Sequence, residues 1–403
     1  MIERINNILN LLKKKQSLLI LGPRGTGKSY FINKLLDTGA LGEHIKINLL
    51  YSEDYRVYLN NPSHLAKQVR ALVSKATRSA YVFIDEIQLI PELLNEVHAL
   101  IEELGPKAVF ILTGSSARKL KRGDVNLLAG RAALINFFPI SSLEYDFELY
   151  FDQIIKYGTL PKIINEADSE IVEAYLNTYT HTYLKEEIQQ EALVRNLPAF
   201  ARFLELAAQH NGQPINCSKI AKLLGVSANT IASYYSILEE TLIAAAIPSW
   251  THSVKHQLQQ SPRYYFFDHG IVRTLCGELR SELTSSSFRF GAMFEALVVN
   301  ELIKAMSINN SPLKLYSFRN RSNKEIDLVL QSGPFATPIG VEIKSATAPT
   351  ASDVRHLKLL KEENSNAKLV VLCRCKYPYE DAGILFEPFL SGIKKIALGE
   401  FGT

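Results

Sequence analysis

Residues 22–29 read Gly22-Pro23-Arg24-Gly25-Thr26-Gly27-Lys28-Ser29. This stretch matches the pattern G-x-x-x-x-G-K-[ST], and it lies between an apolar run, Ser17–Leu21, and a predicted helix, Lys28–Asp37. The glycines let backbone N–H groups curve around phosphate oxygens, and the N-terminus of the following helix adds a favourable field. We therefore predict a nucleotide site formed by residues 22–29 together with Tyr30. In it Lys28 would reach the β- and γ-phosphates and the Ser29 hydroxyl would bind Mg²⁺.

Two carboxylates follow a second apolar run, in the sequence Tyr81-Val-Phe-Ile-Asp85-Glu86. Asp85 at the end of this predicted strand would hold Mg²⁺ through water. Glu86 would act as the general base that polarises the attacking water. No guanine-reading N-K-x-D follows a strand, so ATP is the nucleotide that the sequence favours.

Two later segments supply further candidates for the ATP site. The run Leu112-Thr-Gly-Ser115-Ser follows a predicted strand, and Ser115 is a candidate sensor of the γ-phosphate, although a simple strand-to-loop turn is an alternative. Arg131, in Leu-Ala-Gly-Arg, is a candidate arginine finger for its own subunit or a neighbouring one. The second option would require a homo-oligomer.

The first 140 residues alternate apolar strand-like runs with helical stretches, which is typical of a parallel sheet covered by helices. After Ser17–Leu21, the predicted strands are Ile45–Leu49, Tyr81–Ile84, Ala108–Leu112 and Ala132–Phe137. We therefore expect an α/β protein whose residues 1–140 form a P-loop ATPase domain.

The middle of the chain is predicted to be mainly helical. Residues 141–195 would form a helical lid, broken at Gly158 and Pro161. Residues 196–280 would form a winged helix, with a helix-turn-helix at Cys217–Ile231 and strands at Leu242–Ile247 and Arg263–Phe267. The third helix of this unit, Ala228–Glu240, contains no Lys or Arg, and phosphate contact needs positive charge. Direct DNA reading and a role in interdomain packing therefore both stay open.

Residues 288–403 contain a second group of charged residues that could carry chemistry. Asp327 lies on the predicted strand Glu325–Leu330, and Glu342 and Lys344 project to one face of the next strand, Ile339–Lys344. If these strands are neighbours, the three side chains converge, and Glu295 from the preceding helix, Ala292–Met306, would join them. Asp327 and Glu342 suit Mg²⁺, and Lys344 could orient a metal-activated water, which predicts phosphodiester hydrolysis. A purely structural or degenerate site is the alternative.

Three further predicted elements complete this unit. They are a strand, a helix and a strand, at Lys314–Phe318, Asp353–Glu363 and Lys368–Cys373.

Composition narrows the class of protein. With 403 residues, 47% of them apolar and 21% charged, the chain is expected to form two to three folded domains rather than a disordered polymer. No apolar run approaches the roughly 20 residues of a membrane-spanning helix. Residues Met1–Lys15 read as an amphipathic helix and not as a secretory signal. The net charge of +4 permits nucleic-acid binding without requiring it.

The four cysteines fit neither a disulfide framework nor a zinc pattern, so we expect a reducing, cytoplasmic setting and no membrane partner. They are Cys217, Cys276, Cys373 and Cys375.

Taken together, these segments resemble the prokaryotic AAA-type ATPases that carry a C-terminal domain of unknown function with a PD-(D/E)XK nuclease-like fold. The matching stretches are GPRGTGKS, FIDEIQ, LTGSSA, LAGR, YGTLP at 157–161, YYFFDHG at 264–270, the Phe294-Glu295 segment, EIDLVL and GVEIKS. The resemblance implies ATP binding at Gly22–Ser29 with Asp85 and Glu86. It also implies a nuclease-type metal site at Glu295, Asp327, Glu342 and Lys344. One departure is Glu186-Glu187, where relatives tend to carry an aspartate.

These observations predict an ATP-dependent, DNA-associated enzyme in which ATP binding or hydrolysis moves the lid and gates the acidic site. Two other functions remain open. The chain could be an ATP-driven switch whose last domain only binds DNA or a protein, or an assembly factor built on an ATPase ring.

Overall fold

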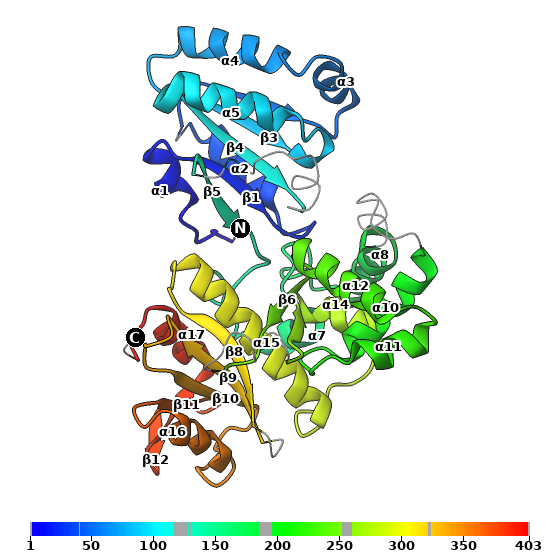
Figure 1. Ribbon diagram of the computed structural model, residues 1–403, viewed down its shortest axis with the longest axis vertical. Helices are drawn as coiled ribbons and strands as arrows, with labels where there is room; N and C mark the ends of the chain where they lie inside the picture. The colour runs from blue at the N-terminus through cyan, green and yellow to red at the C-terminus, as the bar shows by residue number, and fades with distance from the viewer. Residues whose placement is uncertain are drawn as a thin grey trace. The chain divides into compact units, whose positions relative to one another are not determined.

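The computed structural model describes residues 2–39, 41–116, 128, 130–184, 196–251, 260–320 and 324–401 (Figure 1). The chain divides into two compact units, and each is described by itself. The smaller consists of Glu3–Pro139 with Glu240–Ile243, and the larger of Ile140–Glu239 with Ala244–Thr403. The smaller unit ends where the predicted ATPase domain ends. Apart from Glu240–Ile243, the predicted lid, winged-helix and nuclease-like regions belong to the larger unit, and their division into three domains stays a prediction.

The smaller unit contains a five-stranded sheet in the order β2-β3-β4-β1-β5, and all four strand pairs are parallel. The parallel sheet predicted from the sequence is therefore confirmed. β1, β3 and β4 are buried along their whole length, as expected for strands covered on both faces. The five strands are β1 (Ser17–Leu21), β2 (His44–Asn48), β3 (Ala80–Asp85), β4 (Ala108–Gly114) and β5 (Ala132–Asn136).

Helices cover both faces of this sheet, and each face has its own apolar core. One core packs side chains of α1 and α2 against β1, β3 and β4, and the other packs α4 and α5 against the opposite side of the same strands. The helices are α1 (Ile8–Lys13), α2 (Lys28–Asp37), α3 (Ser52–Asn60), α4 (His64–Lys75) and α5 (Leu93–Leu104), with short 3₁₀ turns η1 (Ile87–Leu89) and η2 (Gly105–Lys107).

The predicted bounds of the N-terminal helix, Met1–Lys15, were too wide, because α1 covers only Ile8–Lys13. Side chains before it make contacts that compete with a helix. The Asn6 side chain accepts from Ile8 N at 3.1 Å, and Arg4 reaches Thr26 O at 3.0 Å and Phe138 O at 2.7 Å. Tertiary contacts thus outweigh the amphipathic pattern of the first seven residues.

The first part of the larger unit is helical and carries a small antiparallel hairpin. In the predicted lid region, 141–195, the first helix begins only at Phe151. Gly158 ends it, at the break that the sequence predicted. The turn between α11 and α12 uses Gly225 in the left-handed region, at φ 66°. The elements are α7 (Phe151–Tyr157), α8 (Ser169–Thr178), the π-helical turn η3 (Tyr179–Tyr183), α10 (Leu197–Gln209), α11 (Cys217–Leu224), α12 (Ala228–Glu240), β6 (Ala244–Ile247), β7 (Arg263–Phe266) and α14 (His269–Leu275).

The last part of the larger unit is built on a six-stranded sheet of mixed direction, in the order β12-β13-β11-β10-β9-β8. β9 pairs antiparallel with β8 and β10, whereas β11 pairs parallel with β10 and β13. The single helix predicted at 353–363 is instead a 3₁₀ turn at Arg355–Lys358 followed by a short α-helix at Leu359–Glu363. The elements are α15 (Phe288–Ile308), β8 (Lys314–Arg319), β9 (Glu325–Gln331), β10 (Ile339–Lys344), η4 (Arg355–Lys358), α16 (Leu359–Glu363), β11 (Lys368–Cys373), β12 (Tyr379–Asp381), β13 (Ile384–Pro388) and α17 (Phe389–Ala397).

The hairpin and the six-stranded sheet are joined through backbone hydrogen bonds. Ser317 N on β8 donates to Pro248 O at 2.9 Å, and Trp250 N donates to Ser317 O at 2.6 Å. The segment that follows β6 therefore lies along the edge of the six-stranded sheet, beside β8.

The YGTLP and YYFFDHG stretches meet in the interior of the larger unit. The Asp268 carboxylate accepts from Thr159 N at 2.7 Å and from Gly270 N at 2.9 Å. Gly158 has φ +87°, and a Cβ there would lie 2.1 Å from Asp268 Oδ1. Asp268 therefore connects the loop at residues 158–161 to the start of α14. The contacts of these two stretches are structural.

No helix in the described part of the chain is long and apolar enough to cross a membrane.

Candidate nucleotide and acidic sites

The loop at residues 22–27 has the backbone shape that phosphate binding needs. It leads from β1 into α2, and Gly25 and Gly27 adopt φ of 80° and 91°, a region that favours glycine. Gly22 is required for a different reason, because a Cβ there would lie 2.1 Å from Phe137 O. The chain can therefore pass closely beside the end of β5 and present backbone N–H groups at the N-terminus of α2.

The Lys28 side chain is buried inside this loop. Its ammonium donates to Gly22 O at 2.6 Å and to Pro23 O at 3.1 Å. Arg4 supports the loop from outside through Thr26 O, and its guanidinium lies 4.3 Å above the Phe137 ring. No sequence pattern pointed to Arg4, because its hydrogen-bond partners lie 22 and 134 residues away. Arg24 and Tyr30 are exposed at the loop and on the first turn of α2.

Asp85 lies at the end of β3 and accepts hydrogen bonds from two hydroxyls. Ser29 Oγ donates to Asp85 Oδ1 at 2.8 Å, and Thr113 Oγ1 on β4 donates to the same oxygen. The predicted pair of Mg²⁺-binding groups, Ser29 and Asp85, therefore lies within hydrogen-bond distance. A hydroxyl and a carboxylate at this spacing fit Mg²⁺ that keeps most of its water ligands.

The hydroxyl beside Asp85 belongs to Thr113 rather than to Ser115. Ser115 Oγ instead accepts from Gln88 Nε2 at 3.2 Å. The same Gln88 amide donates to Glu86 Oε2 at 2.5 Å. Ser115 is therefore linked to the candidate general base through Gln88, which the sequence did not single out.

Glu86 adopts the left-handed backbone conformation, with φ 59° and ψ 44°. This conformation is unfavourable for a non-glycine residue, and such strain concentrates at functional sites. Here it accompanies the sharp change of direction from β3 into η1.

Arg131 and the P-loop lie at opposite ends of the parallel strands β1 and β5. Ala132, which follows Arg131, pairs with Ser17 at the start of β1, whereas the P-loop follows Leu21 at the other end, about 13 Å further along the strand. The Arg131 guanidinium forms an ion pair with Glu102. This position does not favour the predicted contact of Arg131 with the nucleotide of its own subunit, and that contact stays a prediction. A role toward a neighbouring subunit stays a prediction.

The structure brings together all four predicted residues of the acidic site in the larger unit. Asp327 on β9 accepts from Ile343 N on β10 at 2.8 Å, and its own N–H lies 3.5 Å from Glu342 Oε2. Lys344 Nζ donates to Glu342 Oε1 at 2.8 Å. Glu295 approaches from α15, near enough to raise the pKa of Asp327 by its charge.

The three carboxylates of this site lie in different electrostatic surroundings. Burial raises the pKa of Asp327 well above its usual value, and the charges of Glu342 and Glu295 raise it further. Burial also raises the pKa of Glu295, against the effect of its hydrogen bond from Tyr265. Burial would raise the pKa of Glu342 too, but His356 and Lys344 hold it below its usual value. Clustered acids of this kind favour a proton or a cation between them.

The site opens into a cavity of about 710 Å³, and its residues suit a cation that retains water. Among the described residues, no group of three or more His, Cys, Asp or Glu side chains is arranged to hold a metal ion by itself. Mg²⁺ needs only one or two carboxylates besides water, and Asp327 and Glu342 supply two. His356 Nε2 lies 3.0 Å from Glu342 Oε1, so a histidine competes for one of these oxygens. The cavity is lined by Lys324, Glu325, Asp327, Glu342, Arg355, His356, Leu359 and Glu362.

His356, Arg263 and Tyr265 belong to this neighbourhood and were not predicted. His356 lies on a short 3₁₀ turn, and Arg263 and Tyr265 lie in an aromatic strand that the sequence marks only as apolar. No local spacing connects any of them with Glu295 or Glu342.

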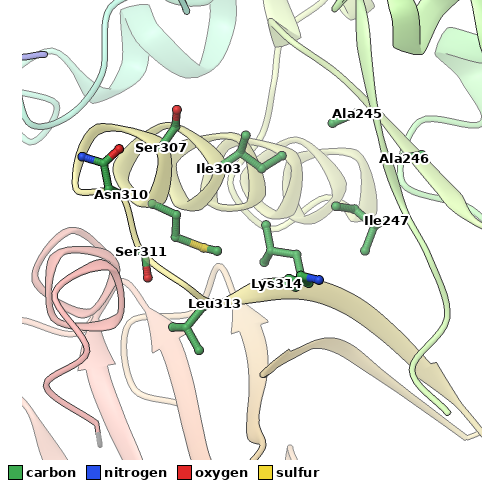
Figure 2. Close-up of a pocket in the computed structure, with 11 residues that line it drawn as sticks. Ala245, Ala246, Ile247, Ile303, Ser307, Asn310, Ser311, Leu313 and Lys314 are labelled. Carbon is green, nitrogen blue, oxygen red and sulfur yellow. The ribbon is translucent and has the colours of Figure 1, made fainter. Parts of the chain in front are cut away.

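A second cavity, of about 500 Å³, lies between the C-terminal half of α15 and strands β6 and β8 (Figure 2). Ile303, Ile247 and Leu313 contribute apolar side chains to it, and Lys314 contributes a charged one. Its described lining holds no carboxylate, so it cannot perform the acid–base chemistry of the acidic site.

The first third of the chain thus has the fold of a P-loop ATPase of the AAA type. Residues 14–146 match the family model described as AAA domain. Residues 148–282 and 290–388 match two further models, each described as a domain of unknown function (DUF8612 and DUF4143, respectively). The predicted Glu186-Glu187 departure lies outside the described residues.

The chain is also similar to proteins without an assigned role. An uncharacterized protein of Mycobacterium tuberculosis is 22% identical over 370 residues, which cover 92% of this chain and 79% of that protein. An uncharacterized protein of Haemophilus influenzae is 24% identical over 301 residues, which cover 69% of this chain and 74% of that protein.

Two solved structures are among those similar to this chain. The RuvB Holliday junction branch migration motor of Thermotoga maritima has a TM-score of 0.28 and 17% identity, covering 59% of this chain and 87% of that one. AMPPCP-bound DnaA of Aquifex aeolicus has a TM-score of 0.27 and 13% identity, covering 58% and 85%.

Proposed function

We propose that this chain hydrolyses ATP at residues 22–30 and that the ATPase controls Mg²⁺-dependent hydrolysis of DNA phosphodiesters at the acidic site. The observation that carries the second part is the convergence of Glu295, Asp327, Glu342 and Lys344 from one helix and two strands. Asp327 and Glu342 line an open cavity, and together with Glu295 and Lys344 they supply the groups that metal-assisted phosphodiester cleavage requires.

In the ATP site each residue has a role that follows from its position. The loop N–H groups and Lys28 would bind the phosphates, and Ser29 and Asp85 would hold Mg²⁺ with its water ligands. Glu86 would take the proton of the attacking water, and Gln88 orients its carboxylate through their 2.5 Å hydrogen bond. Thr113 would fix Asp85 in place from β4.

The ATPase proposal is tested by steady-state phosphate release from ATP. Lys28→Ala should abolish turnover, because the buried ammonium is the cation placed inside the phosphate loop. Lys34→Ala, an exposed position on the same helix, is the matched control and should retain wild-type turnover. Turnover by Lys28→Ala at the wild-type rate would contradict the assignment.

In the acidic site the chain's own residues would bind the cation and manage the proton. Asp327 and Glu342 would hold Mg²⁺, which supplies an activated water and charge stabilisation when bound. Lys344, anchored on Glu342 at 2.8 Å, would orient that water or neutralise developing charge. Glu295 would complete the negative field that attracts the cation.

A second function is favoured by one observation. Lys344 and His356 both contact Glu342 Oε1, so two side chains already occupy a carboxylate oxygen that cation binding needs. In this alternative the acidic site is inactive, and the chain is an ATP-driven switch that binds DNA or a protein partner.

Calorimetric titration with Mn²⁺ separates the two functions. The nuclease proposal predicts binding by the wild-type chain that Asp327→Ala removes. Glu362→Ala, which changes an exposed acid lining the same cavity, should bind as the wild type does. Equal weak binding in wild type and Asp327→Ala would favour the switch.

Association with DNA and with further copies of the chain is also part of the proposal. The net charge of +4 allows DNA binding, but α12 carries no Lys or Arg, so a packing role for α11 and α12 is retained as the alternative. An assembly factor built on an ATPase ring would use Arg131 toward a neighbouring subunit. A strictly monomeric, fully active ATPase would exclude that use.

The setting that we propose is the cytoplasm. The four cysteines are free thiols in the structure, which suits a reducing compartment.

A further inference from the structure

Strand β7 presents two polar side chains toward the acidic site. Successive residues of a strand face opposite sides, so Arg263 and Tyr265 share one face and Tyr264 and Phe266 share the other. Arg263 and Tyr265 are almost fully buried, with 5% and 1% of their surface exposed. A buried guanidinium or phenol needs a partner, because an unpaired polar group in the interior is costly.

Both side chains find that partner in the acidic site. Tyr265 Oη donates to Glu295 Oε1 at 2.6 Å. Arg263 Nη1 lies 4.0 Å from the same oxygen, and Arg263 Nη2 donates to Glu325 Oε2 at 2.6 Å. Glu295, on α15, thus receives a hydrogen bond and a nearby positive charge from β7, a strand outside the six-stranded sheet that carries Asp327 and Glu342.

These contacts fix the direction of a carboxylate that has few other constraints. Glu295 projects from α15, and the hydrogen bond from Tyr265 together with the nearby Arg263 charge favours one position of its Oε1. Burial and the Glu295 charge raise the pKa of Tyr265 well above its usual value, so the phenol keeps the proton that it donates. Arg263 also ties Glu325, at the start of β9, to the same hairpin.

We propose that Arg263 and Tyr265 are positioning residues that orient Glu295 toward Asp327 and Glu342. This inference rests on the proposed function of the acidic site and extends it. The site is composite, because β7 belongs to the region matched at residues 148–282, whereas its carboxylates belong to the region matched at 290–388. Movement of the β6–β7 hairpin would therefore change the cation affinity of the acidic site.

The chain offers a matched control in the neighbouring tyrosine. Tyr264 lies on the other face of β7, and its ring packs against Tyr235 with the centroids 4.4 Å apart. Tyr265→Phe and Tyr264→Phe each remove one hydroxyl from the same strand and keep the aromatic ring. Only the first removes a donor from Glu295.

The experiment measures Mn²⁺ affinity by calorimetry on the full chain, together with the Mn²⁺ dependence of DNA cleavage. Residues that orient groups at a metal site typically change metal affinity about 10-fold to 100-fold when replaced. Tyr265→Phe should therefore weaken Mn²⁺ binding about tenfold or more, and Tyr264→Phe should leave it within about twofold. Excess Mn²⁺ should restore the cleavage rate of Tyr265→Phe, which a general folding defect would not allow.

Arg263→Lys provides a second test that does not depend on Tyr265→Phe folding. It keeps the positive charge but loses the forked geometry that reaches Glu295 and Glu325 together, and it should also weaken Mn²⁺ binding. Wild-type Mn²⁺ affinity in both variants, with affinity lost in Glu295→Gln, would overturn the positioning role while leaving the acidic site intact. A wild-type chain that neither binds Mn²⁺ nor cleaves DNA would instead refute the proposed function itself, and the positioning role with it.

Discussion

At the level of single residues, the Thr113 hydroxyl is a hydrogen-bond partner of Asp85 that the sequence did not single out. It and Ser29 donate to the same oxygen of Asp85, from two different elements. Ser29 would turn to Mg²⁺ in the working site, which leaves Thr113 as the group that keeps the carboxylate in place. The sequence pointed to the loop after β4 but selected Ser115, because spacing alone does not distinguish hydroxyls two positions apart.

Replacing Thr113 by Val should slow ATP turnover by about 10-fold to 100-fold, because a hydrogen bond to a charged group contributes about 1.5–3 kcal/mol. ATP affinity should change much less, since the loop and Lys28 are untouched. Phosphate release and equilibrium binding of ATP measure the two effects. Thr113→Ser restores the donor and should recover most of the rate; a Val variant with wild-type turnover would refute this role.

Gly158 illustrates a position where both backbone and space demand glycine. Its φ is +87°, and a Cβ would lie 2.1 Å from Asp268 Oδ1, the oxygen that Gly270 N also uses. Gly158→Ala should therefore lower the free energy of unfolding of the larger unit by about 3 kcal/mol or more. Denaturant titration with a probe of the larger unit measures the loss.

Gly277 serves as the control for this substitution. It also has a positive φ, +70°, but a Cβ added there would meet open space, with nothing beyond its chain neighbours within 4 Å. Gly277→Ala should lower stability by only about 1–2 kcal/mol, the usual effect of a left-handed conformation alone. Equal losses in the two variants would show that the Asp268 contact is unimportant.

At the level of elements, α15 holds a buried polar network in the larger unit. Lys304 Nζ donates to Glu301 Oε1 at 2.8 Å, to Ile140 O at 3.0 Å and to Thr159 Oγ1 at 3.1 Å. Glu301 in turn accepts from Ser142 N at 2.6 Å. Buried charges persist only when they are paired in this way, so the network fixes the loop before α7 against α15.

His269 on α14 makes the stability of this region depend on pH. Burial lowers its pKa below the ordinary value of 6.5, and its Nε2 contacts Ile154 O in the middle of α7. Three charged groups surround it: the charges of Asp268 and Glu301 raise the pKa of His269, whereas the charge of Lys304 lowers it. The folded chain therefore binds this proton less readily than the unfolded chain does.

Neutral His269 should contribute fully to the free energy of unfolding above pH 6.5. This contribution should be lost as the pH falls below 6.5, because the unfolded chain then binds the proton more readily than the folded chain. Denaturant titrations from about pH 7.5 to about pH 5 should show this decline in the wild type. The His269→Gln variant should have a lower free energy of unfolding than the wild type at neutral pH. Its free energy of unfolding should fall less steeply as the pH is lowered. Parallel pH profiles for the two proteins would contradict the assignment.

Elements with strong local signals were predictable from sequence. β1 and α2 were predicted with the bounds that they have, because the glycine-rich loop marks the end of one and the start of the other. β12, β13, α17 and α14 were missed, since each is short or depends on tertiary contacts. In the acidic site, the alternation of Asp327, Glu342 and Lys344 on strands was readable. Tyr265 was not, because it lies 30 residues from Glu295 in the chain.

At the level of the whole molecule, an ATPase unit is joined in one chain to a second unit that carries the acidic site. The central claim is that the acidic site cleaves DNA phosphodiesters and that ATP controls this activity. The P-loop and the carboxylate cluster lie in different units, so a single substitution in either unit can test one proposed activity separately.

The most direct test is a DNA cleavage assay on the full chain with Mg²⁺ or Mn²⁺, with and without ATP, on single- and double-stranded substrates. We predict metal-dependent cleavage by the wild type that Lys344→Ala abolishes and that Lys361→Ala, an exposed lysine on α16, retains. Lys28→Ala should cleave without responding to ATP, or not at all. Absence of cleavage under every condition, with ATP turnover intact, would contradict the central claim.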